Sequence, residues 1–260
     1  MADELFSVAG KRILITGGAS GIGRMITDGL AERGARIFTC SRKQPALDEL
    51  VAELKAKRGF DVTAEAADLS KLEDVERIAR RAGELFGGQL DVLINNAGAT
   101  WGSEIDEFPE SGWDKVFDLN VKALFFLTQK CLPLLRKAGS KPDKLARVIN
   151  IGSISGIENP MDNAWSYHPA KAAVHHLTQT LAKKLVKEGI AVNAIAPGLF
   201  PSKMTAFMMP GGSDELVSQA IPMGRAGRPS DIVGTVVYLA SAASGFTTGS
   251  IIKVDGGSAL

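Results

Sequence analysis

Short apolar runs alternate along the chain with longer segments in which apolar residues recur at helical spacing. The runs predict β-strands, of which the third is the weakest, at 12–16, 36–40, 61–66, 90–94, 147–151, 190–195 and 250–254. The longer segments predict amphipathic helices at 22–32, 47–57, 72–85, 113–135 and 170–187. Such alternation is typical of βαβ units, and right-handed crossovers then build a doubly wound parallel sheet.

Composition supports one ordinary globular unit. The 260 residues are 45% hydrophobic and 23% charged, enough apolar surface to form a large core. No internal repeat and no Pro/Gly/Ser-rich linker divides the chain, and the polar stretch at 138–146 predicts a surface loop. We expect a single α/β domain over residues 1–260, with a Rossmann-like fold and a seven-stranded parallel sheet flanked by helices.

Charge and cysteine content narrow the function classes. The 30 basic and 29 acidic residues are interspersed, so no basic stripe predicts a nucleic-acid partner. No apolar run reaches bilayer length and the first ten residues lack a basic leader, so we expect no membrane association and a cytoplasmic protein. Cys40 and Cys131 fit a reducing compartment. They lack metal-ligand spacing, and His168, His175 and His176 lack completing carboxylates, so we expect no metal and structural histidines.

A glycine-rich stretch, TGGASGIG at 16–23, directly follows the first predicted strand and opens a predicted helix. Glycines let the backbone approach a pyrophosphate, and a helix N-terminus presents free N–H groups and a positive dipole end. In this context the stretch predicts a phosphate cradle, although a tight structural turn is the alternative. The candidate residues are Gly17, Ser20, Gly21, Ile22 and Gly23.

Tyr167 and Lys171 are one helical turn apart, so both side chains can share a helix face. A free phenol has a pKa of about 10, and a nearby cation would lower it toward the range useful for proton transfer. Spacing alone is weak evidence because such pairs occur by chance. Pro169 lies between them, and proline is tolerated only in a helix's first turn, so the helix either begins near Ser166 or is kinked.

Three motifs in order, TGxxxGxG at 16–23, NNAG at 95–98 and the Tyr167-x-x-x-Lys171 pair, resemble the short-chain dehydrogenase/reductase family over about residues 11–257. The resemblance implies that Tyr167 exchanges the proton and that Lys171 also binds the nicotinamide ribose. It implies that Ser153, with Ser155 as the alternative, holds the substrate oxygen. Asn120 would support a water-linked proton route, although an asparagine bonded to nearby backbone is the plainer interpretation.

The same resemblance assigns further cofactor contacts. Asp68 and Leu69 would meet the adenine, although a loop aspartate can equally cap a helix. Ser41, Arg42 and Lys43 follow the second predicted strand, where a carboxylate would favour NAD and a cation favours the 2′-phosphate of NADP(H). Solvated surface charges are the alternative. The remaining residues that the resemblance places beside the cofactor are Asn95, Ala97, Gly98, Pro197, Gly198 and Ser202.

Residues 199–223 predict a substrate lid, because apolar side chains surround a Pro-Gly-Gly break. Packing of these side chains on the core or between subunits is the alternative. Several segments, including 147–153 and 196–202, resemble bacterial 3-oxoacyl-[acyl-carrier-protein] reductases of the rhamnolipid-associated type. We therefore expect NADP(H)-dependent reduction of a 3-oxoacyl thioester or similar apolar ketone by a homotetramer. Alternatives are a sugar, steroid or diketone substrate, epimerisation or dehydration of a nucleotide sugar, and a non-catalytic NADP(H) sensor.

Overall fold

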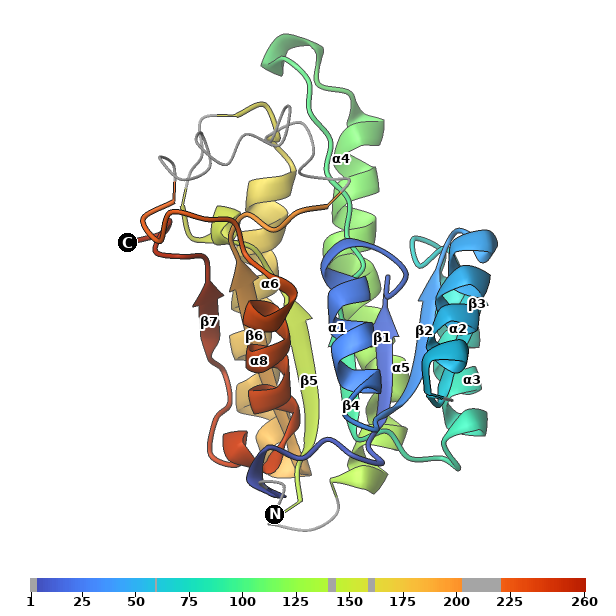
Figure 1. Ribbon diagram of the computed structural model, residues 1–260. Helices are drawn as coiled ribbons and strands as arrows, with labels where there is room; N and C mark the ends of the chain where they lie inside the picture. Colours follow the sequence, from blue (N-terminus) through green and yellow to red (C-terminus); the bar gives the residue numbers. More distant parts are fainter. Residues whose placement is uncertain (1–3, 59, 140–143, 159–161, 203–220) are drawn as a thin grey trace.

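A single parallel sheet contains every strand of the computed structural model, which describes residues 4–58, 60–139, 144–158, 162–202 and 221–260. The strand order is β3-β2-β1-β4-β5-β6-β7 (Figure 1). The strands are β1 (Arg12–Thr16), β2 (Arg36–Ser41), β3 (Val62–Ala66), β4 (Val92–Asn95), β5 (Ala146–Ile151), β6 (Ile190–Pro197) and β7 (Ile251–Val254). The predicted doubly wound, seven-stranded α/β fold is confirmed.

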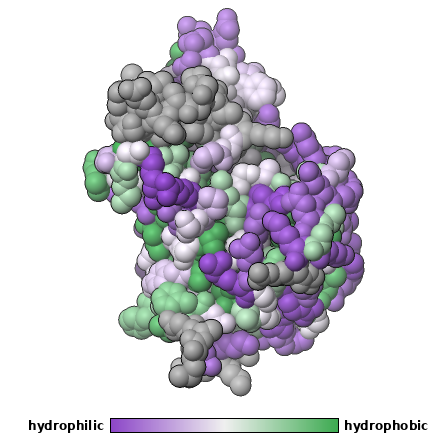
Figure 2. Space-filling model, viewed as in Figure 1, coloured by the Kyte–Doolittle hydropathy of each residue, from purple (hydrophilic) through white to green (hydrophobic). Residues whose placement is uncertain are grey.

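Helices cover both faces of the sheet and bury two hydrophobic cores (Figure 1). One core packs the sheet against α1 (Gly21–Ala31), α2 (Gln44–Arg58) and α8 (Pro229–Ala240). The other packs it against α3 (Leu72–Leu85), α5 (Ala123–Ala138) and α6 (Tyr167–Leu185). Hydrophilic side chains cover the outer surface over α2 (Figure 2), as expected for a helix with one buried face.

One predicted helix differs from the observed structure, and one observed helix was not predicted. The helix expected at 113–135 is three pieces, α4 (Glu110–Phe117), a π-turn η3 (Asp118–Lys122) and α5. The sequence prediction also omitted α8, in which no charged residue after Asp231 marks the outer face, although its buried residues recur at helical spacing. Its N-terminal signal was present, because Pro229 opens the helix and the Asp231 carboxylate accepts a 2.7 Å hydrogen bond from the Arg228 N–H.

The site is positioned by the strand order, which reverses between β1 and β4. In open parallel sheets a crevice forms at such a switch point, beyond the carboxyl ends of the strands. The TGGASGIG stretch follows β1, the NNAG stretch follows β4, and the segment with Ser153 follows β5. All three motifs therefore lie on the same side of the sheet, at the carboxyl ends of the strands, which is called the cofactor edge below.

At the opposite side of the sheet, where the strands begin, Arg12 and Asp91 join the starts of β1 and β4. Arg12 donates hydrogen bonds of 2.7 and 2.9 Å to the Asp91 carboxylate, whose side chain is only 9% exposed. Burial would raise the pKa of Asp91, but the hydrogen bonds and charge of Arg12 lower it below its usual range. β4 begins at Val92 and not at residue 90, where the predicted strand began. Leu90 belongs to the preceding loop, and its N–H donates a hydrogen bond to the Leu134 carbonyl.

We predict that Asp91→Asn lowers the free energy of unfolding by about 2 kcal/mol, because it leaves the Arg12 guanidinium partly buried without its anion. Asp61→Asn is the matched control, since Arg36 and Asp61 are 45% and 57% exposed and such pairs contribute roughly 0–1 kcal/mol. Urea denaturation measures both. Equal losses in the two variants would contradict the structural role of Asp91.

Candidate active site

Two glycines in the turn after β1 and the first turn of α1 have no space for a side chain. A methyl group on Gly23 would lie 2.2 Å from the Gly17 carbonyl oxygen, and one on Gly18 would lie 2.3 Å from Thr39 Oγ1. Gly17 and Gly21 have φ of 70° and 54°, in the left-handed region that favours glycine. The turn thus brings bare backbone to the helix N-terminus.

A brace that the sequence interpretation missed holds this turn in place. The Asn96 side chain donates a 2.8 Å hydrogen bond to the Thr16 carbonyl. The Thr16 hydroxyl in turn accepts hydrogen bonds of 2.9 Å from the N–H groups of Asn96 and Ala97. The signal was available, since Asn96 belongs to the NNAG stretch. These bonds join the loop after β4 to the turn after β1, so both borders of the crevice are fixed together.

The N-terminus of α1 is electrostatically suited to phosphate. Its first turn contains no acidic residue, and Ser20, at the N-cap, uses no side-chain oxygen for capping. Free N–H groups and the helix dipole therefore face the crevice. Ile22 belongs to the partly buried residues that pack on the core beneath. The bare backbone at Gly17, Gly21 and Gly23 is a cradle that fits a dinucleotide pyrophosphate.

Beyond β2, Arg42 and Lys43 are exposed, and neither forms an ion pair with any residue in the described ranges. Ser41, the last residue of β2, is partly buried. Asp68 does not cap a helix, since the N-cap of α3 is Lys71 and the Asp68 carboxylate accepts hydrogen bonds from Ser70 instead. Leu69 is buried beside it.

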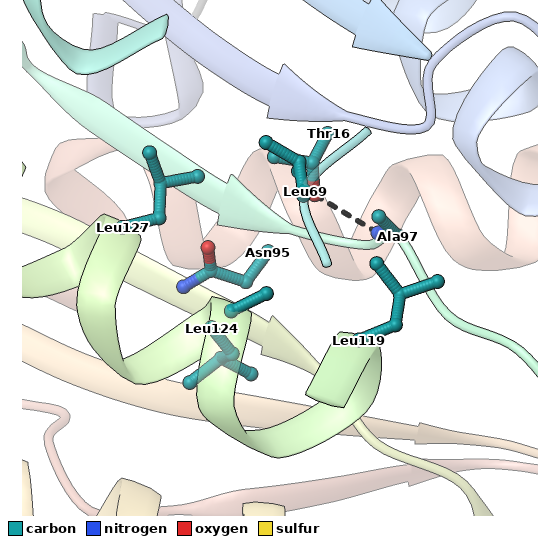
Figure 3. A pocket seen from close by; sticks show the side chains of 8 residues that line it. Thr16, Leu69, Asn95, Ala97, Leu119, Leu124 and Leu127 are labelled. Atoms are coloured by element: carbon teal, nitrogen blue, oxygen red, sulfur yellow. Dashed lines mark hydrogen bonds between the residues drawn. The ribbon is translucent and has the colours of Figure 1, made fainter. Parts of the chain in front are cut away.

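Asn95 supports the sheet from within. Its Nδ2 donates to Thr128 and to Asn150 Oδ1 at 2.9 Å, and Asn150 donates to Thr178. This buried network joins β4 and β5 to α5 and α6. Within the described ranges Asn95 Oδ1 has no hydrogen-bond partner, and Asn95 borders a cavity of about 10 Å³ that Leu69 and Ala97 also line (Figure 3). That volume is about one water molecule, too small for any part of a dinucleotide.

Tyr167 and Lys171 face each other in the first turns of α6. The helix begins at Tyr167 with Ser166 as its N-cap, so Pro169 lies in the first turn and no kink separates the pair. Lys171 Nζ lies 5.6 Å from the Tyr167 ring centre and donates a 2.8 Å hydrogen bond to the Ile151 carbonyl at the end of β5. The side chains therefore share the edge where β5 ends.

Ser153 reaches the same place from the other side. Its hydroxyl lies close enough to Tyr167 to lower the pKa of the phenol, whereas Ser155 only donates a 3.1 Å hydrogen bond from its own N–H to Ser153 Oγ. The structure thus brings Ser153, rather than Ser155, to the tyrosine. Two hydroxyls that meet in this way can both donate to one substrate oxygen.

Asn120 lies in the π-turn, and its side chain spans both backbone groups of Ala99 with bonds of 2.8 and 2.9 Å. A methyl group on Gly98 would lie 3.1 Å from Asn120 Oδ1 and 3.7 Å from Lys171 Nζ. Gly98 thus allows the two side chains to approach the same point. Single π-turns are frequent at functional sites, and here the turn aims Asn120 at the loop after β4.

The expected lowering of the Tyr167 pKa is wrong for this structure. Burial raises the pKa of Tyr167 above its ordinary value, the Asp162 carboxylate adds to the rise, and the hydrogen bond with Ser153 opposes it. Burial also lowers the pKa of Lys171 to about 8. Desolvation is the largest cause of both shifts, because it disfavours the charged form of each side chain. The phenol is therefore held protonated at neutral pH, the form of a proton donor.

The predicted residues after β6 lie at the same edge. Gly198 contacts the C-terminal loop so closely that a methyl group on it would lie 2.8 Å from Asp255 Cα. Pro197 ends the strand, and the Ser202 side chain lies 3.2 Å from the position that a Cβ on Gly21 would occupy. Most of the predicted lid at 199–223, residues 203–220, lies outside the described residues.

Among the described residues, no group of His, Cys, Asp and Glu has metal-ligand geometry. No helix in the same part of the chain is both long and apolar enough to cross a membrane. His168 instead pairs with Asp162 at 2.7 Å, which ties the loop ahead of α6 to its first turn.

A phosphate cradle and a pair of converging hydroxyls at one edge of a doubly wound sheet define a class, the dinucleotide-dependent oxidoreductases. A family model described as enoyl-(acyl carrier protein) reductase matches residues 17–259. The chain belongs to the short-chain dehydrogenase/reductase family.

Individual relatives match nearly the full chain. The rhamnolipids biosynthesis 3-oxoacyl-[acyl-carrier-protein] reductase of Pseudomonas aeruginosa is 46% identical over 253 residues, 97% of each chain. The 3-oxoacyl-[acyl-carrier-protein] reductase FabG of Thermotoga maritima is 34% identical and covers 95% of this chain and 97% of its own. The solved complex of Pseudomonas aeruginosa RhlG with NADP has a TM-score of 0.93, 45% identity and 99% coverage of both chains.

We predict that Gly23→Ala weakens NADPH binding by at least roughly tenfold, because the added methyl group forces the Gly17 carbonyl out of the cradle. Gly234→Ala is the matched control. Gly234 also lies within a helix, but a methyl group there meets no atom within 4 Å, and alanine is the better helix former. Titration of NADPH fluorescence measures both. Unchanged affinity in Gly23→Ala would contradict the cradle.

Proposed function

We propose that this protein is an NADP(H)-dependent reductase of an apolar ketone, with a 3-oxoacyl thioester as the leading substrate. The observation that carries the proposal is the approach of the Ser153 hydroxyl to the Tyr167 phenol, beside the buried Lys171. A ketone oxygen placed between the hydroxyls receives two hydrogen bonds as its negative charge develops.

Each residue has a defined task in this proposal. NADPH, when bound, supplies the hydride. The protonated Tyr167 donates its proton to the substrate oxygen, and Ser153 donates a second hydrogen bond that holds this oxygen. Lys171 stabilises the phenolate that remains and binds the nicotinamide ribose. Both polar atoms of the Asn120 side chain are hydrogen-bonded to the backbone of Ala99. In this proposal Asn120 therefore supports the proton route to Lys171 through its own backbone, in the π-turn.

The remaining cofactor contacts follow the geometry of the crevice. Backbone N–H groups at Gly21, Ile22 and Gly23, with the Ser20 hydroxyl, hold the pyrophosphate, while Gly17, whose own N–H bonds to the Cys40 carbonyl, lets bare backbone approach it. The adenosine end lies against the residues beyond β2 and β3, and the nicotinamide end against those beyond β4 and β6. In that order these residues are Ser41, Arg42, Lys43, Asp68, Leu69, Asn95, Ala97, Gly98, Pro197, Gly198 and Ser202.

Preference for NADP(H) over NAD(H) rests on Arg42. Its guanidinium is exposed and makes no ion pair within the described ranges, so its donors are available to a 2′-phosphate. No carboxylate stands at the end of β2 to accept ribose hydroxyls instead, since Ser41 is the last residue of that strand. The NADP complex of the structurally similar Pseudomonas aeruginosa protein supports the same preference.

The choice of a 3-oxoacyl substrate rests on two relatives that carry this activity in their names and on the apolar lid expected at 199–223. We propose that this lid belongs to a single domain over residues 1–260. Sugars, steroids and diketones are the alternative substrates, because the fold alone does not select among them.

We further propose a cytoplasmic homotetramer. β7 is an edge strand, and hydrophobic side chains gather along this edge of the molecule (Figure 2). Phe246 and Leu260 are fully exposed in the monomer and Met223 is 71% exposed. Such surface favours burial against another copy. Sedimentation of the protein at any mass other than that of four chains would refute the tetramer, and its recovery outside the cytoplasmic fraction would refute the location.

We predict that acetoacetyl thioester oxidises NADPH in the presence of the wild-type protein. Tyr167→Phe should still bind NADPH but lose at least roughly 100-fold in kcat, because general acid catalysis contributes that much. The panel adds a crotonyl thioester, a diketone, a keto-steroid and sugars. Reduction of only the crotonyl thioester would indicate an enoyl reductase, and no turnover in either direction would indicate a sensor. Near-normal ketone reduction by Tyr167→Phe would place the proton donor elsewhere.

We also predict that Arg42→Ala raises KM for NADPH by roughly tenfold or more and leaves KM for NADH within about twofold, because the 2′-phosphate loses a charged partner. Lys43→Ala, the exposed neighbour, serves as a comparison of two cations at the same strand end. Steady-state kinetics with both cofactors provide the measurement. An equal effect of Arg42→Ala on the two cofactors would show that the guanidinium does not recognise the 2′-phosphate.

A further inference from the structure

A third residue continues the line of Tyr167 and Lys171 along α6. His175 follows Lys171 by one helical turn and is only 5% exposed, yet the proposed proton transfer does not use it. Its neighbour His176 is exposed. A buried imidazole one turn from the lysine needs a physical explanation, because burying a polar ring without a complete set of partners is unfavourable.

His175 packs against the start of the turn that carries Ser153. Gly152 comes directly after β5, and its N–H donates a 2.7 Å hydrogen bond to the Ile195 carbonyl of β6. On its other side is the imidazole, since a methyl group on Gly152 would lie 2.1 Å from His175 Nε2. Gly152 is therefore held between β6 and the histidine ring, with no space for a side chain.

The same ring reaches the far end of that turn. The His175 ring also lies close enough to the backbone of Gly156, the last residue of the 3-10 helix η4 (Ile154–Gly156), for that backbone to raise the pKa of the imidazole. Gly156 also lies directly on α6, where a methyl group would come within 2.6 Å of the Lys171 carbonyl carbon. One side chain thus contacts both Gly152 and Gly156, which flank Ser153 on the two sides.

We propose that His175 is a positioning residue for the reaction, because its ring spans Gly152 and Gly156 and thereby fixes Ser153 against Tyr167. The proposal rests on the proposed function, in which Ser153 holds the substrate oxygen. Ser153 itself is 9% exposed, and its hydroxyl is already engaged with Tyr167 and with the Ser155 N–H. A small shift of the turn would separate the two hydroxyls from one shared oxygen position.

The electrostatic surroundings require that the ring act in its neutral form. Burial lowers the pKa of His175, the positive charge of Lys171 lowers it further, and the hydrogen bond with Gly156 opposes both effects. Nε2 is buried and has no hydrogen-bond partner among the residues that the structure describes. The neutral tautomer with its N–H on Nδ1, toward Gly156, leaves only a lone pair at Nε2 unsatisfied.

Variants of equal shape separate the hydrogen bond from the packing. His175→Asn retains a donor where Nδ1 lies, and His175→Leu has nearly the same shape without it. We expect His175→Leu to lower kcat roughly tenfold and His175→Asn less than about threefold, with KM for NADPH within about twofold in both. His176→Leu, the exposed control, should match the wild type. Wild-type kcat in His175→Leu, equal losses of kcat in Leu and Asn, or a parallel loss of NADPH affinity would overturn the proposal.

A measurement on the wild-type protein covers the case in which His175→Leu does not fold. In protein with ¹⁵N-labelled histidine, the His175 ring signals, assigned by their absence from His175→Asn, should show the Nδ1–H tautomer and no protonation at pH 6.5. A ring that titrates at the ordinary value or carries its proton on Nε2 would overturn the positioning role. This result is independent of turnover, so it is distinct from a failure of the proposed ketone reduction.

Discussion

The hydrogen bond from Lys171 Nζ to the Ile151 carbonyl is the contact on which the rest of the site depends. It joins the first turns of α6 to the last residue of β5 and so places the helix along the strand. Tyr167, one turn earlier, then faces the segment that leaves β5 with Ser153. Because Lys171 is buried, this bond also satisfies a donor that would otherwise be costly to remove from water.

Behind this contact, a buried polar network ties the crevice to the sheet. Asn95 and Asn150, on adjacent strands, bond to each other and to threonines on α5 and α6. Such networks specify one arrangement of their elements, because any displacement leaves a buried polar group without a partner. The same reasoning applies to Thr16 and Asn96, which join the turn after β1 to the loop after β4. The halves of the site are therefore held by interactions within the sheet rather than by the loops alone.

Most of the fold was predictable because alternation of apolar runs and helical periods reports local structure directly. α8 was missed because no charged residue after Asp231 contrasts with its apolar face, and the π-turn was missed because it interrupts a continuous pattern by a single register change. The cofactor edge was predictable because its glycines, which have no side chain, let the backbone approach a pyrophosphate. Asn96 was overlooked because the NNAG stretch marks this loop but does not show which of its two asparagines braces the neighbouring turn.

The sequence by itself determined which motif follows which predicted strand, the glycine-rich cradle, and the spacing of Tyr167 and Lys171. Each of these depends on residues that are close together along the chain. Only the tertiary structure decided that Pro169 lies in a first turn, that Ser153 rather than Ser155 meets Tyr167, and that the phenol pKa rises. It also decided which of two adjacent histidines is buried. These outcomes depend on helix phase and on desolvation, and both are set by packing between segments far apart in sequence.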